Sequence, residues 1–175
     1  MKLKVSLFLM FAVALTGCVD IPDFDDAPKI YYNGVDQFTE VNDSTGRKIR
    51  EKVIITIDFE DGDGDLGASD LERSDSSFIR KYGTWGNYEL ITARKGAGGQ
   101  WTESVLAEDQ FKWMPILKPD GKPGPLKGKL DLNTSFLYGN STIPITVKFK
   151  VRIRDRNLHV SNQIETDTLQ VPGYR

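Results

Sequence analysis

Cysteine and histidine are almost absent from this chain of 175 residues, which contains one of each. A single thiol cannot form a disulfide within the chain, so the fold must rely on its core, with or without the help of a metal ion. The only histidine, His159, follows the polar run Asp155–Leu158, where a solvated side chain is expected more than a general base. This shortage of nucleophiles and bases predicts that the chain is not an enzyme.

A basic surface and a second long apolar segment are also lacking. Lysine and arginine number 23 against 25 aspartates and glutamates, which gives a formal net charge of −2. Because nucleic-acid binding requires a basic patch or stripe, we expect no nucleic-acid partner. Beyond the N-terminal region, no segment has the run of about 20 apolar residues that a membrane-spanning helix requires.

Residues 1–17 have the parts of a bacterial export signal. Lys2 and Lys4 supply the positive start, Val5–Leu15 forms an apolar core, and small residues follow. The run Leu15-Thr16-Gly17-Cys18 resembles a lipobox, which implies cleavage before Cys18 and attachment of lipid to its sulfur. The alternative is an ordinary secretory signal with an incidental cysteine, but the lipobox also explains why the sole cysteine lies here.

Residues 18–29 form an acidic tether that contains two prolines and should stay extended. Acidic residues directly behind a lipidated cysteine resemble the export signal of Bacteroidota surface lipoproteins. On that interpretation the protein is anchored by lipid to the outer membrane and faces the cell surface. If the tether is only a solvated linker, the domain faces the periplasm instead.

Residues 30–175 are typical of one all-β domain. The segment 53–60 is rich in β-branched residues, and Val147–Ile153 alternates apolar side chains with lysine and arginine. A long surface loop is expected at the Pro- and Gly-rich residues 118–125, and at most a short helix within 66–79. Several short strands separated by turn signals predict an antiparallel β-sandwich. The other expected strands are 30–32, 88–94, 101–105, 129–132 and 166–171.

Alternating carboxylates mark the segment that follows the strand predicted at 53–60. Asp61, Asp63 and Asp65 are separated by glycines, which let the backbone curl so that several oxygens converge. Ca²⁺ prefers about 6–8 such oxygens, so the spacing predicts a structural calcium site. The alternative is an exposed turn without an ion, because Asp-Gly pairs are also strong turn formers.

Further ligands are available on both sides of this loop. In the numbering of a twelve-position calcium loop, Glu72 occupies the last position, but Leu66 stands where an EF-hand requires glycine. The segment is therefore not an EF-hand, and Asp70 or Glu72 is expected to complete a site on a β-scaffold. Asp155 and Asn157 follow the strand Val147–Ile153, and they join the site if that strand and 53–60 end on the same side of the sandwich.

These motifs together resemble one group of proteins. The lipobox, the acidic tether, the run Asp58–Gly67 and the late Arg154-Asp155-Arg156, followed by Ser161-Asn162, are similar to small Bacteroidota surface lipoproteins of unknown role. The resemblance implies a lipid-anchored protein with a single immunoglobulin-like β-sandwich. It implies no activity, because a fold does not specify a function.

Two kinds of binding function remain open. The first is a non-catalytic module that contacts a partner protein or supports an envelope assembly. The second is a carbohydrate-binding accessory, because Tyr82, Trp85 and Tyr88 cluster in one glycine-bearing region and an exposed ring there could stack on a glycan. The same aromatics could instead fill the core, so the solvent exposure of Trp85 distinguishes the two interpretations.

Overall fold

The computed structural model describes residues 22–139 and 143–173. The predicted export signal and Cys18 lie outside these residues. Within these residues the helices are α2 (Asp70–Ser74) and α3 (Ser76–Tyr82), and the 3₁₀ turn is η2 (Ala107–Asp109). The strands are β1 (Lys29–Val41), β2 (Lys48–Asp61), β3 (Tyr88–Lys95), β4 (Trp101–Ser104), β5 (Leu126–Leu137), β6 (Pro144–Ile153), β7 (Ile164–Glu165) and β8 (Leu169–Pro172).

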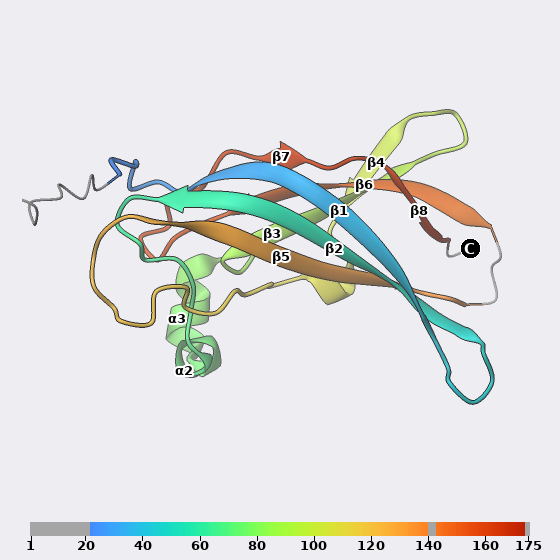
Figure 1. Ribbon diagram of the computed structural model, residues 1–175, viewed down its shortest axis with the longest axis horizontal. Helices are drawn as coiled ribbons and strands as arrows, with labels where there is room; N and C mark the ends of the chain where they lie inside the picture. Colours follow the sequence, from blue (N-terminus) through green and yellow to red (C-terminus); the bar gives the residue numbers. More distant parts are fainter. Residues whose placement is uncertain (1–21, 140–142, 174–175) are drawn as a thin grey trace, which may run out of the picture.

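The strands form two antiparallel sheets that pack face to face (Figure 1). One sheet has the order β1-β2-β5, and the other has the order β4-β3-β6-β7, with β8 also paired to β6. An immunoglobulin sandwich places its strands A, B and E in one sheet and C, F and G in the other. Strands β1, β2 and β5 take the first three places, β3 and β6 take C and F, and β7 with β8 takes G. The predicted immunoglobulin-like sandwich is confirmed.

Alternation along β2 and β6 builds the core. Val53, Ile55 and Ile57 point inward from β2, and Phe149 and Val151 point inward from β6. Burying each of these side chains stabilises the fold by about 1.5–3 kcal/mol. Further core side chains come from β1, β3, β5 and β8, among them Ile30, Leu90, Leu132, Phe136 and Val171.

One end of the sandwich carries the two helices. Helices α2 and α3 lie there, and the long segment that follows β4 reaches the same end before β5 begins (Figure 1). Buried Asn87 fixes this segment, since its side-chain amide donates to the Met114 carbonyl at 3.0 Å and its oxygen accepts from the Met114 N–H at 2.6 Å. Ala68 N–H also donates to Met114 O at 3.1 Å, so residues 66–68 and 114–117 lie side by side.

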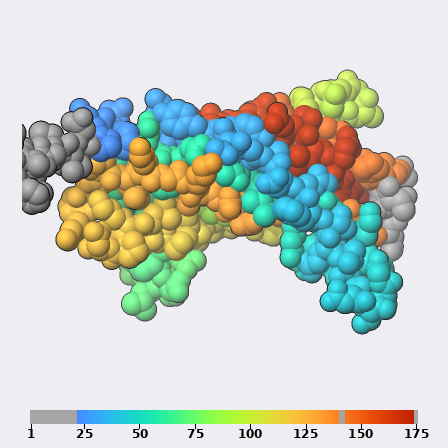
Figure 2. Space-filling model, in the orientation of Figure 1, coloured from blue at the N-terminus to red at the C-terminus, as the bar shows by residue number. Residues whose placement is uncertain are grey.

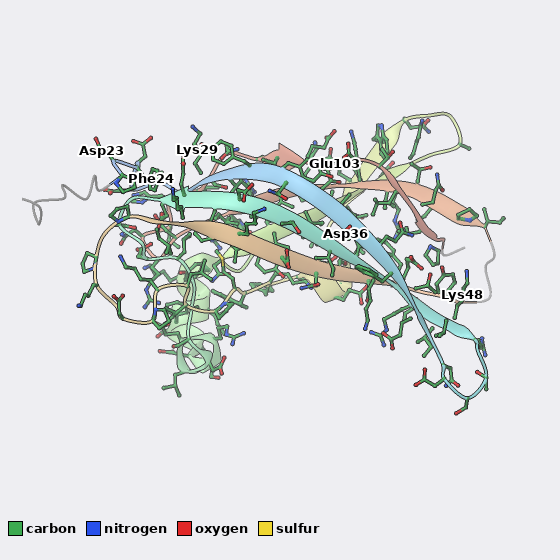
Figure 3. All side chains as sticks on the ribbon, in the orientation of Figure 1. Asp23, Phe24, Lys29, Asp36, Lys48 and Glu103 are labelled. Carbon is green, nitrogen blue, oxygen red and sulfur yellow. The ribbon has the colours of Figure 1, made fainter. Side chains whose placement is uncertain are left out.

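The chain enters at this same end. Figure 3 shows Asp23 and Phe24 there, whereas Lys48 lies toward the opposite end. Asp25 O accepts a hydrogen bond from Gly62 N–H at 2.8 Å, and Pro28 is buried. The last residues of the predicted tether therefore rest on the domain rather than standing free of it. In Figure 2 the blue N-terminal segment borders the yellow and orange surface of the loop that precedes β5.

Within the described residues, no helix is both long and apolar enough to cross a membrane.

Candidate functional site

The acidic loop begins where β2 ends and is shaped by two glycines. Gly62 lies so close to the backbone of Phe24 and Asp25 that a Cβ atom would overlap it. Gly64 has a φ of 71°, in the left-handed region, and a Cβ there would overlap Gly124 O. Gly124 N–H also donates to Asp63 O at 3.0 Å. The loop is thus clamped between the entering chain and the segment before β5.

Three carboxylates converge inside this clamp. Oxygens of Asp61, Asp63 and Asp65 all lie within 4.8 Å of one another. The N–H of Asp65 donates to Asp61 Oδ2 at 3.1 Å and to Asp63 Oδ1 at 3.3 Å, which holds the curl closed. Asp61 is fully buried, and its Oδ1 atom has no hydrogen-bond partner among the described residues. A buried carboxylate oxygen without a donor is costly, so this atom requires a ligand or a proton.

The electrostatics of the loop agree with this geometry. Burial, together with the charges of Asp63, Asp65 and Asp155, raises the pKa of Asp61 to about 7. Burial and the charges of Asp155 and Asp63 also raise the pKa of Asp65 to about 6, against the opposing effect of the Arg156 N–H. The crowded anions disfavour their own ionisation, and a bound divalent cation would reverse that preference.

The turn after β6 reaches the same place, because β2 and β6 end on the same side of the sandwich, a condition that the sequence alone leaves open. Arg156 N–H donates to Asp65 Oδ1 at 3.3 Å, and the Asn157 side-chain amide donates to Asp63 Oδ2 at 3.3 Å. Asp155 is fully buried, but His159 occupies both of its oxygens, through the backbone N–H at 2.8 Å and ring Nδ1 at 2.7 Å. Asp155 therefore acts on the loop through its charge.

Asp70 and Glu72 have other partners. Asp70 is exposed and forms an ion pair with Arg73. Glu72 completes a capping box with Ser69, whose N–H donates to Glu72 Oε2 at 2.9 Å, and it forms an ion pair with Arg156. The hydrogen bond from Arg156 lowers the pKa of Glu72 to about 2. Neither residue belongs to the group of converging carboxylates.

The aromatic residues singled out from the sequence do not form one exposed platform. Tyr82 and Tyr88 are buried, at 2% and 8% exposure, and only Trp85 is partly accessible. The Arg154 guanidinium lies 3.9 Å from the centre of the Trp85 ring and 4.7 Å from that of Tyr82. Its Nε also donates to Gly86 O at 2.9 Å. Arg154 thus fastens the segment after α3 to the sheet.

Two features of the site are not predicted by the sequence pattern. Lys118 Nζ donates to Gly124 O at 3.0 Å, which brings a cation against the acidic loop. The Asp25 carbonyl buttresses Gly62 from the other side. The two accepting atoms, Gly124 O and Asp25 O, belong to residues far from the acidic loop in the sequence, and no local pattern of side chains identifies such backbone atoms.

Comparison with models of protein families, with curated proteins and with solved structures finds no match to this chain. The geometry of the described residues therefore carries the functional inference.

Proposed function

We propose that this protein is a non-catalytic lipoprotein of the outer membrane, exposed at the cell surface, whose sandwich is stiffened by Ca²⁺ and serves protein interaction or envelope assembly. The observation that carries the calcium site is the buried, unpartnered Oδ1 atom of Asp61 amid converging carboxylates. A cation there satisfies this oxygen and offsets the mutual repulsion of the loop.

The ligands follow from the contacts of the loop. Asp61, Asp63 and Asp65 supply carboxylate oxygens, Asn157 supplies its amide oxygen after the amide that now donates to Asp63 Oδ2 turns over, and waters complete the shell of about 6–8 oxygens. The oxygen-only donor set suits a hard cation such as Ca²⁺ and contains no sulfur or imidazole. An affinity of about 10⁻⁴–10⁻³ M is expected, which is typical of extracellular modules. The ion is then a structural staple rather than a switch.

A non-catalytic role agrees with the surroundings of His159. Its Nδ1 atom contacts buried Asp155, and that hydrogen bond raises the pKa of His159. For nucleophilic catalysis, a hydroxyl or thiol must lie within hydrogen-bonding reach of the base that activates it. In the described part of the chain, no serine, threonine or cysteine side chain is hydrogen-bonded to this ring.

The calcium site is tested on the chain from Val19 onward, which contains every strand and helix that the structure describes. Thermal melts are recorded with millimolar Ca²⁺ and with EDTA. We expect Ca²⁺ to raise the melting temperature of the wild type and of Asp43→Asn, a matched change in the exposed turn between β1 and β2. Asp61→Asn should show no response. Equal melts of the wild type in Ca²⁺ and in EDTA would exclude the site.

The anchor is tested separately on the full chain in a bacterial host. Labelled fatty acid should be incorporated into the wild type and not into Cys18→Ser, and only the wild type should fractionate with membranes. Protease added to whole cells should then degrade a surface-exposed domain and spare a domain that faces the periplasm. Equal labelling of the two chains would refute lipidation of Cys18.

A carbohydrate-binding role is the second candidate, and one cavity favours it. Trp85 lines a cavity of about 420 Å³ together with Phe111, a residue that is 43% exposed and whose φ is 53°. A left-handed backbone is uncommon for a bulky side chain and is frequent at functional sites. Affinity electrophoresis in soluble polysaccharides tests this candidate: wild type should be retarded and Phe111→Ala should not. Equal mobility of the two chains in every gel would reject it.

A further inference from the structure

A second cavity adjoins the acidic loop. It has a volume of about 510 Å³, and Asp63, Asp65 and Asn157 line it. Lys118 and Lys122, from the loop before β5, line it as well. Apolar contacts come from Leu66, Ile116 and Pro123. The cavity thus joins the proposed calcium ligands to two cations.

The two lysines do not neutralise the acidic loop directly. Lys118 is half-buried and donates one hydrogen bond, to Gly124 O, although an ammonium group has three donors. Lys122 is exposed. Within residues 22–139 and 143–173, neither ammonium lies within ion-pair distance of a carboxylate. Both therefore retain donors for a ligand in the cavity.

The balance of charge in the cavity depends on the metal. Without an ion, the carboxylates of Asp61, Asp63 and Asp65 outweigh the two lysines and repel an anion. With Ca²⁺ bound, the ion and the two lysines balance the charges of these carboxylates and of Asp155, so an anion is no longer repelled, and the ion itself accepts further oxygen ligands. Arg156 alters neither state, because it is already paired with Glu72.

We infer that the calcium-loaded cavity binds a phosphate group, with one phosphate oxygen on the ion and others accepting hydrogen bonds from Lys118 and Lys122. This inference rests on the proposed calcium site. A tetrahedral phosphate has enough oxygens to contact a metal and two ammonium groups at once, and lysine is a common partner of phosphate as a compact point charge.

Two sources of phosphate fit this chemistry: a soluble phosphate ester and a lipid head group. The chain enters beside the cavity, because Asp25 O is bonded to Gly62 N–H at 2.8 Å. From Cys18 to Pro22 an extended chain spans about 14 Å. An acylated Cys18 would therefore hold the cavity close to the head groups of its own membrane.

The experiment first records melts of the chain from Val19 with Ca²⁺, and then measures binding of glycerol 3-phosphate by calorimetry with Ca²⁺ or EDTA. Glycerol is the control ligand. The double variant Lys118→Gln, Lys122→Gln is compared with Lys95→Gln, Lys127→Gln, which changes the net charge equally at exposed sites outside the cavity. We expect binding only with Ca²⁺, unchanged in the control variant and weakened about tenfold for each lysine removed from the cavity.

The source is resolved by sedimentation with vesicles of phosphatidylcholine, with and without phosphatidylglycerol. Calcium-dependent binding to phosphatidylglycerol vesicles alone assigns the site to a lipid head group. Binding of glycerol 3-phosphate as well assigns it to a phosphate group of either source.

If Ca²⁺ raises the melting temperature but neither probe binds, the calcium site stands and the phosphate inference is overturned. If Ca²⁺ has no effect, both fail. Equal binding by the two double variants also overturns the inference.

Discussion

Replacing Asp61 by asparagine should stabilise the metal-free protein at pH 8 while it abolishes the response to Ca²⁺. Asp61 is fully buried, and its Oδ2 atom accepts the Asp65 N–H at 3.1 Å. An asparagine oxygen can keep that hydrogen bond, and its amide can donate to a neighbouring carboxylate. The change therefore removes a buried charge but retains the hydrogen bond that shapes the loop.

The magnitude follows from the pKa of Asp61, which is raised from 3.8 to about 7 by burial first and then by neighbouring anions. One pKa unit corresponds to about 1.4 kcal/mol, so the fully ionised group destabilises the metal-free fold by about 4 kcal/mol at most. Because the pKa is higher in the folded state, the penalty is absent below about pH 4. It grows as the pH rises and is complete above about pH 7. In a chain of this size it lowers the melting temperature by on the order of 10 °C.

The assay is a series of melts in EDTA between pH 4 and pH 8, on wild type, Asp61→Asn and the control Asp43→Asn. The wild type and the control should lose stability together as the pH rises, and Asp61→Asn should lose less. The reasoning is refuted if Asp61→Asn melts at or below the wild type at pH 8. It is also refuted if the difference between the two is the same at both ends of the pH range.

Three other perturbations have defined outcomes. Gly64→Ala should destabilise the fold by about 1–2 kcal/mol through its left-handed backbone, and more through overlap with Gly124 O, which urea denaturation would measure. Glu72→Gln should cost about 1–2 kcal/mol at pH 7, after solvent screening of the partly exposed pair with Arg156. Because that pair lowers the pKa of Glu72 to about 2, the cost should disappear as the pH falls from about 4.5 to about 2; a constant difference in acid melts would contradict the pairing. Phe149→Ala empties a fully buried site and should cost about 3–5 kcal/mol with Ca²⁺ or without it.

The strands differ in how much of their length the hydrophobic pattern of the sequence predicts. The regular alternation within Val147–Ile153 predicts most of β6, because one face of that strand is fully buried. For β1 the sequence predicts only 30–32, whereas the strand runs from Lys29 to Val41. Beyond Gly34 most of its side chains are polar or exposed, and the strand is held by its backbone pairing with β2. A hydrogen-bonded ladder of this kind leaves little hydrophobic pattern to recognise.

In the candidate site, contacts within one loop can be predicted from the sequence, but contacts between distant segments cannot. The alternating spacing of Asp61, Asp63 and Asp65 predicts their convergence, because all three lie in one short loop. Glu72 does not join these carboxylates, because Ser69 and Glu72 have the spacing of a capping box. Its carboxylate therefore caps the start of α2. Lys118 and Lys122 reach the cavity through tertiary packing of the loop before β5, which no spacing in the sequence encodes.

The most direct measurement is a titration of Ca²⁺ into the ¹⁵N-labelled chain from Val19 onward, followed through its amide chemical shifts. The amides of Gly62, Gly64, Asp65 and Arg156 should shift together and saturate with a Kd of about 10⁻⁴–10⁻³ M, while the turn that contains Asp43 stays unchanged. In Asp61→Asn the same amides should not respond. If these amides stay in place for the wild type through millimolar Ca²⁺, the acidic loop is a bare turn and the proposed calcium site is wrong.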